Sequence, residues 1–253
     1  MKRLISFFVA VLLSAISLVH GREYVNRTFH SSLGQNIPYE IAFPENFNPQ
    51  QSYPLLLFLH GSGERGTDNV SQLIHGGDLF LNDPGLQNVI VIAPQCPAED
   101  YWVNIIHPGN KSERMFPESA PISVSLYGVK ELLDAFVSLG FVDTTHVYGC
   151  GLSMGAFGIL DLSVRFPDFF SAVQPICGGI NTDRFKDWNG RTAFRFFHGL
   201  KDDIVLPRFS IAADEVLKEK AVESSIVLYP EANHNSWDPA FSEPDFIKWF
   251  LLH

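Results

Sequence analysis

Cysteine and basic residues are scarce in this chain of 253 residues. Its three cysteines, Cys96, Cys150 and Cys177, are too few and too far apart for a disulfide framework or a zinc motif. Lys and Arg number 18 against 28 Asp and Glu, for a formal net charge of −10, and no extended basic run occurs. This balance argues against nucleic acid or an anionic membrane surface as a partner, and favours neutral or cationic ones. Cys150 and Cys177 each end a strand-like run, so they are expected to be buried thiols or, alternatively, a disulfide pair.

Charge is absent from one stretch near the start, the apolar run Leu4–Val19. Lys2 and Arg3 precede it and Gly21 closes it, an order that predicts a secretory signal peptide over residues 1–21. The alternative is an uncleaved anchor, but sixteen apolar residues are short for a membrane span. We therefore expect a single mature domain over residues 22–253 that is secreted or periplasmic and has no stable membrane insertion. Its formal net charge would be −12, because it would contain 16 basic and 28 acidic residues.

Internal repeats and low-complexity tracts are also missing after residue 21, and strand-like and helix-like runs alternate instead. Several of the strand-like runs are continuously apolar, which is typical of strands covered on both faces. This alternation predicts an α/β fold, with a mostly parallel doubly wound sheet and helices on both faces. The expected strands are Ile37–Phe43, Tyr53–Leu59, Val89–Ala93, His146–Cys150, Ala172–Cys177, Ala193–Phe197 and Ile226–Tyr229, and the expected helices are Ser123–Leu139, Met154–Arg165, Phe209–Lys220 and Asp245–Leu252.

One long segment, Pro94–Pro121, has no clean period and carries isolated aromatic residues. A loop of this length inside a compact domain is usually functional, and the aromatics Tyr101, Trp102 and Phe116 favour a lid or a pocket wall. The alternative is a surface excursion packed by its own side chains.

Ser153 lies in Gly151-Leu152-Ser153-Met154-Gly155, a G-x-S-x-G pentapeptide between a strand-like and a helix-like run. A serine on such a sharp strand-to-helix turn presents its hydroxyl at the top of the sheet, and close backbone contacts require the flanking glycines. We therefore expect Ser153 to be a nucleophile, which needs a base and an acid that orients the base.

His234 is the expected base, because it lies in a polar loop after the last strand-like run, where binding crevices of doubly wound sheets form. His60 and His198, which end apolar runs, are expected to brace the sheet. Asp202 is the expected acid and the adjacent Asp203 the alternative. The order Ser153, Asp202, His234 is that of α/β-hydrolases.

A glycine-rich turn, His60–Gly66, follows an early strand and is suited to hold an oxyanion. The expected donors are the backbone N–H groups of Met154 and Ser62, and Gly61 or Gly63 could replace Ser62. A phosphate-binding loop is disfavoured because the turn lacks the G-x-x-x-x-G-K-[ST] pattern.

These motifs, with Ala93-Pro94-Gln95-Cys96-Pro97 and the run from His234 to Pro239, resemble the α/β-hydrolase superfamily. The resemblance is closest to secreted esterases of the polyhydroxybutyrate-depolymerase-like and feruloyl-esterase-like groups, often described as predicted peptidases or phospholipases. It implies Ser153 as nucleophile, Asp202 as acid, His234 as base, Ser62 and Met154 as oxyanion donors, and no cofactor and no metal.

The expected activity is hydrolysis of carboxylic esters, with acetyl or feruloyl esters on extracellular polysaccharide or a related polymer as first choice. Trp102 and Trp237 are candidate substrate contacts, with core packing as their alternative role. Two other functions stay open. One is a serine peptidase of the prolyl-oligopeptidase type without a propeller, and the other is a secreted binding module on a hydrolase fold.

Overall fold

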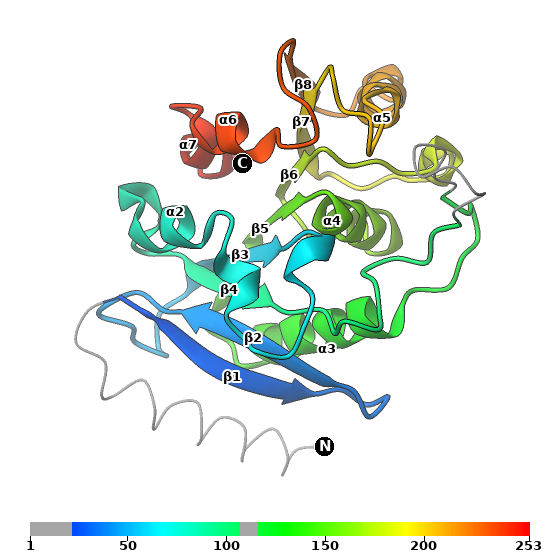
Figure 1. Cartoon of the computed structure of the whole chain (residues 1–253). Helices are drawn as coiled ribbons and strands as arrows, with labels where there is room; N and C mark the ends of the chain where they lie inside the picture. Colours follow the sequence, from blue (N-terminus) through cyan, green and yellow to red (C-terminus); the bar gives the residue numbers. More distant parts are fainter. Residues whose placement is uncertain (1–21, 107–115) are drawn as a thin grey trace.

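The structure is a computed structural model and describes residues 22–106 and 116–253. One eight-stranded sheet runs through the molecule in the order β1-β2-β4-β3-β5-β6-β7-β8 (Figure 1). The pairs β1–β2 and β2–β4 are antiparallel and the remaining pairs are parallel. The strands are β1 (Tyr24–His30), β2 (Asn36–Ala42), β3 (Tyr53–Leu59), β4 (Ile90–Pro94), β5 (Val142–Leu152), β6 (Ala172–Ile176), β7 (Ala193–Gly199) and β8 (Ser224–Tyr229).

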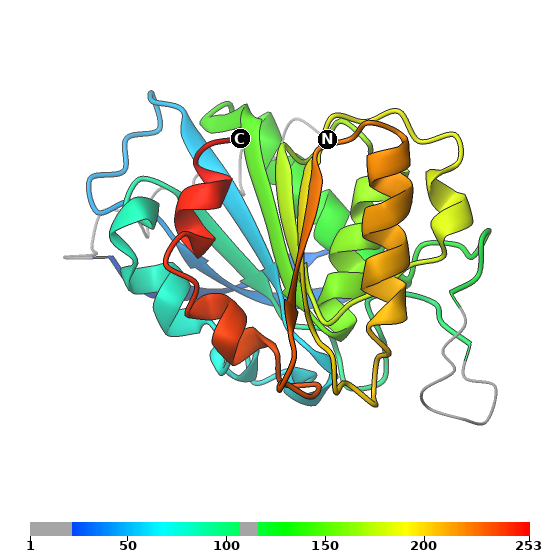
Figure 2. The same cartoon turned by 90° about the horizontal axis from the view of Figure 1, so that it is seen from above.

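Helices cover both faces of this sheet, as the view from above shows (Figure 2). One face carries α3 (Val124–Ser138), α4 (Met154–Arg165) and α5 (Arg208–Glu219), and the other carries α2 (Gly77–Asn82), α6 (Trp237–Phe241) and α7 (Phe246–Phe250). Short 3-10 helices lie in the connections: η1 (Ser62–Glu64), η2 (Ser71–Leu73), η3 (Pro84–Leu86) and η4 (Thr182–Phe185).

Strand β3 shows why its continuously apolar sequence forms a central strand. Side chains alternate between the faces of a strand, so Leu55 and Leu57 join the core under α3 and α4, while Leu56 and Phe58 join the core under α2 and α7. All four are buried. Both faces of the strand are therefore covered, which is why the sequence of β3 is almost entirely apolar.

The predicted fold class is confirmed, and so are all seven predicted strands, with shifts at their ends. β1 was not predicted, because it is an edge strand in which Asn26 and Arg27 interrupt the apolar pattern. The short helices α2 and α6 were also missed, and the last helix is only Phe246–Phe250.

Three further predictions concern the start of the chain, membrane spans and the cysteines. The predicted signal peptide, residues 1–21, lies outside the described residues. Within those residues no helix is long and apolar enough to cross a membrane. All three cysteines are described, and Cys150 and Cys177 are buried as thiols with no disulfide between them.

Candidate active site

Ser153 stands on the turn between β5 and α4, in a backbone conformation that side chains rarely adopt. Its φ of 50° and ψ of −113° place it in the strained region expected of a strand-to-helix turn that presents a side chain. The flanking glycines explain how the turn closes. A Cβ on Gly155 would lie 1.9 Å from the Leu59 carbonyl oxygen, and one on Gly151 would lie 2.5 Å from the Gly155 carbonyl. Only glycine fits either position.

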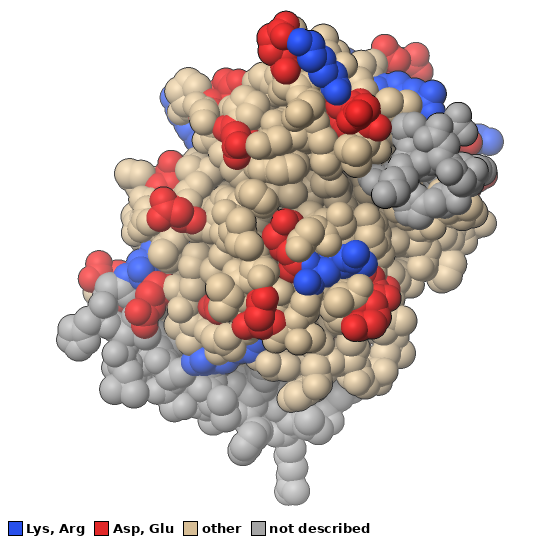
Figure 3. Space-filling view, in the orientation of Figure 1, with Lys and Arg blue, Asp and Glu red and all other residues tan. Residues whose placement is uncertain are grey.

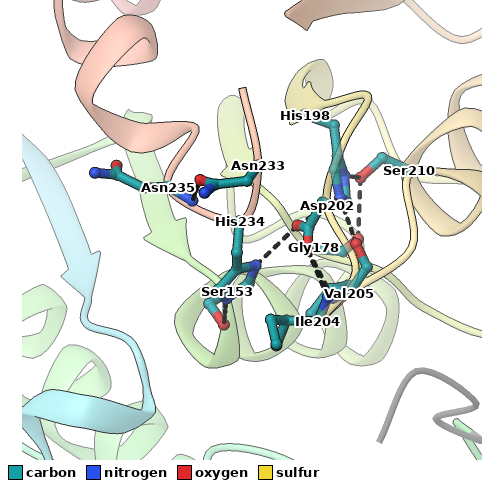
Figure 4. A network of polar contacts seen from close by, with 10 residues as sticks. All are labelled: Ser153, Gly178, His198, Asp202, Ile204, Val205, Ser210, Asn233, His234 and Asn235. Atoms are coloured by element: carbon teal, nitrogen blue, oxygen red, sulfur yellow. Dashed lines mark hydrogen bonds and ion pairs between the residues drawn. The ribbon is translucent and has the colours of Figure 1, made fainter. Parts of the chain in front are cut away.

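Three side chains from three loops form a hydrogen-bonded series at this turn (Figure 4). Nε2 of His234 lies 3.0 Å from the Oγ atom of Ser153, and Nδ1 of His234 lies 2.8 Å from Oδ2 of Asp202. The ring is therefore placed to accept the serine proton at Nε2 while Nδ1–H donates to the carboxylate. The alternative acid, Asp203, is exposed, and the contact to His234 is made by Asp202.

Asp202 is held as an ionised carboxylate in the loop that follows β7. Burial raises the pKa of its carboxyl group, but the hydrogen bonds from His198, His234 and the Val205 N–H outweigh it, so the pKa lies well below its usual range. Oδ1 accepts the N–H groups of Ile204 and Val205, each at 2.9 Å. The carboxylate is thus fixed in position and ionised.

The predicted oxyanion turn is oriented by the side chain of His60. Nδ1 of His60 lies 2.6 Å from the Gly61 carbonyl oxygen, and Nε2 accepts the Cys96 N–H at 2.9 Å. Nδ1 therefore carries the hydrogen and donates it to Gly61. Because C=O and N–H point in opposite directions across a trans peptide, the Ser62 N–H is turned away from His60. This orientation favours Ser62 over the alternative at Gly61.

The two predicted oxyanion donors occupy equivalent positions. Ser62 is the first residue of η1 and Met154 the first of α4, and the first N–H groups of a helix have no acceptor within it. The start of α4 also lies against the end of β3, because a Cβ on Gly155 would contact both the Leu59 and His60 carbonyl oxygens. The two helix starts are thereby brought to the same end of the sheet.

The two tryptophans predicted to contact substrate lie in different environments. The prediction is wrong for Trp102, which is fully buried in the core and donates its indole N–H to the His60 carbonyl oxygen at 3.1 Å. Trp237 is partly exposed, and its ring stands edge-on to His234 with the ring centres 5.7 Å apart. A substrate contact for Trp237 stays a prediction.

The described part of Pro94–Pro121 packs against the domain. Phe116 lies edge-on to Phe157 and Phe209, at centroid distances of 5.0 and 5.4 Å, and Tyr101 lies under the Arg65 guanidinium. Residues 107–115 of this segment lie outside the described residues, so its role as a lid stays a prediction.

Charges of both signs are interspersed on the face of the molecule shown in Figure 3, with acidic groups spread over several elements. This distribution is in keeping with the acidic net charge of the chain. Whether the chain avoids nucleic acid is still a prediction.

No family model and no curated protein sequence matches the chain. Solved structures do match it. A thermostable esterase is 29% identical with a TM-score of 0.77, and the match covers 90% of this chain and 62% of that one. A ferulic acid esterase from Anaeromyces mucronatus, solved with ferulic acid, has a TM-score of 0.64 at 16% identity, with 91% of each chain covered. An S-formylglutathione hydrolase from Staphylococcus aureus has a TM-score of 0.66 at 16% identity, covering 91% of this chain and 99% of that one.

The fold is that of an α/β-hydrolase. The more distant of these structures support the fold alone, and the thermostable esterase adds an esterase-like resemblance over most of the chain. The chain spans somewhat less than two thirds of the length of that esterase, so its activity is a matter for proposal.

One residue that sequence reasoning assigned only to bracing the sheet lies within the site. His198 contacts Asp202 directly, with Nε2 3.2 Å from Oδ2. The two residues are four apart, and a turn in which the Asp202 N–H meets the Gly199 carbonyl folds one back toward the other. The spacing His198-Gly199-Leu200-Lys201-Asp202 is the sequence feature that could have indicated this contact.

Proposed function

We propose that this chain is a serine esterase that hydrolyses carboxylic esters through an acyl-enzyme. The observation that carries the proposal is the hydrogen-bonded series from Ser153 through His234 to Asp202. Serine hydroxyls are weak nucleophiles near neutral pH, and this geometry supplies the base that one needs. The esterase-like resemblance of the whole fold supports the same activity.

The mechanism has two acyl-transfer steps. Ser153 Oγ attacks the ester carbonyl carbon while His234 Nε2 takes its proton, and the resulting imidazolium is stabilised by the Asp202 carboxylate. The N–H groups of Met154 and Ser62 would stabilise the oxyanion. The imidazolium then gives its proton to the leaving alkoxide, so that an alcohol departs. In the second step His234 activates a water molecule, which attacks the acyl-enzyme and releases the acid.

Acetyl or feruloyl esters on an extracellular polysaccharide or a related polymer are the proposed substrates, and the proposed location is secreted or periplasmic. The basic and then apolar start of the chain supports export, and its acidic surface suits a neutral polymer. One structure with the same fold is a ferulic acid esterase solved with ferulic acid. Neither oxyanion formation nor acyl transfer in this proposal calls for a cofactor.

The direct test is hydrolysis of p-nitrophenyl acetate by the Ser153→Ala variant. We expect kcat to fall by roughly 10⁴-fold or more, because the nucleophile is removed. Ser163→Ala is a matched control, since Ser163 lies in α4, the helix that follows Ser153, and its hydroxyl donates to the Ile159 carbonyl oxygen. Equal activity of Ser153→Ala and the wild type would refute the assignment of the nucleophile.

One further measurement defines the reaction. A panel of acetyl, feruloyl, longer acyl and peptide substrates would identify the acyl group, and preferential peptide cleavage would replace the esterase proposal.

A further inference from the structure

Cys177 directly follows β6, beside the nucleophile. The Ser153 N–H donates to the carbonyl oxygen of Ile176, at 2.9 Å, so the ends of β5 and β6 are joined at this point. Cys177 and Ser153 both have positive φ, 43° and 50°, where their strands turn out of the sheet. The mechanism proposed above assigns no role to this thiol.

The thiol belongs to a compact group of potential metal ligands. One ligand atom each from Cys177, Asp202 and His234 lie within 4.8 Å of one another, and no other group of this kind occurs in residues 22–106 and 116–253. Cys177 and Asp202 are buried, and the His234 side chain is 21% exposed. A metal ion would therefore reach the group from the His234 side.

The chemistry of the three ligands suits a borderline-soft divalent cation. Thiolate, imidazole and carboxylate are the side chains that bind zinc, with bonds of about 2.0–2.3 Å, and three protein ligands leave one tetrahedral position open. Ligand atoms around such an ion are about 3.5 Å apart. Binding would therefore shorten a widest separation of up to 4.8 Å by about 1.3 Å, and lengthen the 2.8 Å between Asp202 Oδ2 and His234 Nδ1 by about 0.7 Å. One thiolate and one carboxylate also balance the two charges of the ion. Thiolate ligation disfavours Mg²⁺ and Ca²⁺, which prefer oxygen.

We propose that Cys177, Asp202 and His234 form an inhibitory Zn²⁺ site. The Cys177 thiol loses its proton to solvent and its sulfur binds the ion, as does one Asp202 oxygen. His234 binds through Nδ1, so its hydrogen moves to Nε2 and its hydrogen bond to Asp202 is lost. Nε2–H cannot accept the proton of Ser153, and the nucleophile is left without a base. The inhibition rests on the esterase proposal, whereas binding of the metal does not.

The first test titrates Zn²⁺ against p-nitrophenyl acetate hydrolysis by the wild type, Cys177→Ala and Cys96→Ser. Each activity is normalised to the same variant without metal. We expect wild-type activity to be lost and restored by EDTA, and the half-inhibitory Zn²⁺ concentration to rise about tenfold or more in Cys177→Ala. Cys96→Ser is a matched control, because Cys96 is buried but belongs to no ligand group, and its inhibition should equal that of the wild type. Mg²⁺ should inhibit none of the three.

The second test does not depend on activity. Co²⁺ is added to Ser153→Ala with and without the Cys177→Ala change, and thiolate-to-metal absorption in the near ultraviolet is recorded. We expect the band only where Cys177 is present, and Cys177→Ser serves if the alanine variant does not fold. If the wild type proved to have no esterase activity, this band would still establish the metal site. Absence of the band in Ser153→Ala, or equal zinc inhibition in folded Cys177→Ala and wild type, would overturn the proposal.

Discussion

Nε2 of His198 lies 3.2 Å from Oδ2 of Asp202, the same oxygen that accepts Nδ1–H of His234 at 2.8 Å. Nε2 of His198 also lies 2.8 Å from the Val205 carbonyl oxygen, so it faces two acceptors and carries a hydrogen. Its ring is fully buried, and its other nitrogen contacts the Ser210 hydroxyl at 2.8 Å. Two histidines therefore contact the Asp202 carboxylate, the buried His198 on one side and His234 on the side of Ser153.

Replacing His198 by alanine should lower kcat by roughly ten- to a hundredfold with little change in KM, because Asp202 would no longer be held in line with His234. Ser210→Ala removes the outer contact of His198 and the hydrogen bond from the Ser210 hydroxyl to the Gly178 carbonyl oxygen, and it should have a smaller effect because the contact between His198 and Asp202 is kept. Steady-state kinetics with p-nitrophenyl acetate, and circular dichroism to verify folding, would measure both. An unchanged kcat in a folded His198→Ala variant would mean that His198 only packs the sheet.

The close contact at Gly155 leads to a prediction about stability. Gly155→Ala places a Cβ 1.9 Å from the Leu59 carbonyl oxygen. Because the atoms that it meets are backbone atoms of Leu59 and His60, we expect a loss of about 4 kcal/mol or more, or failure to fold. Gly63→Ala is the matched control in the oxyanion turn, where a Cβ meets nothing within 4 Å, and should change stability by less than about 0.5 kcal/mol. Urea unfolding compares the two. A stable Gly155→Ala protein would show that the turn can shift to make room.

The part of the site that follows the ends of strands could be predicted from the sequence, whereas side-chain orientations and hydrogen positions could not. Ser153, Asp202 and His234 each follow an apolar run, and the carboxyl ends of parallel strands share one edge of a sheet, so their meeting could be expected from the pattern. A large aromatic residue in a loop gives no indication of which way it faces, and Trp102 is buried where a substrate contact was predicted. The hydrogen positions on His60 depend on partners at Gly61 and Cys96 that only the folded chain brings together.

Glu40 is a buried carboxyl group on β2 whose charge should be costly. Burial raises its pKa to about 7, with Arg27 partly opposing the shift, and its Oε2 atom has no hydrogen-bond partner among the described residues. Since this pKa is above the unfolded value, the native state holds the proton more tightly. The resulting stability is present below about pH 4.5 and is lost as the pH rises through 7.

Glu40→Gln should therefore raise the free energy of unfolding by roughly 1–3 kcal/mol at about pH 8 and change it little at about pH 4.5. Urea unfolding at the two pH values tests this, and an equal effect at both would exclude titration of Glu40 as the cause.

His60 should give the opposite dependence over the same range. Burial lowers the pKa of its ring to about 4, so the unfolded chain takes up a proton before the native state does. Its contribution is fully present above about pH 6.5 and is lost as the pH falls toward 4, a total of about 3 kcal/mol. In the wild type, the pH dependences of stability that Glu40 and His60 contribute therefore oppose each other between about pH 4.5 and pH 7.

Glu40→Gln should leave the His60 dependence visible as stability that falls with decreasing pH, and adding His60→Asn should remove that dependence. Urea unfolding of both proteins across this range measures the two slopes. Parallel curves would show that His60 does not titrate on unfolding.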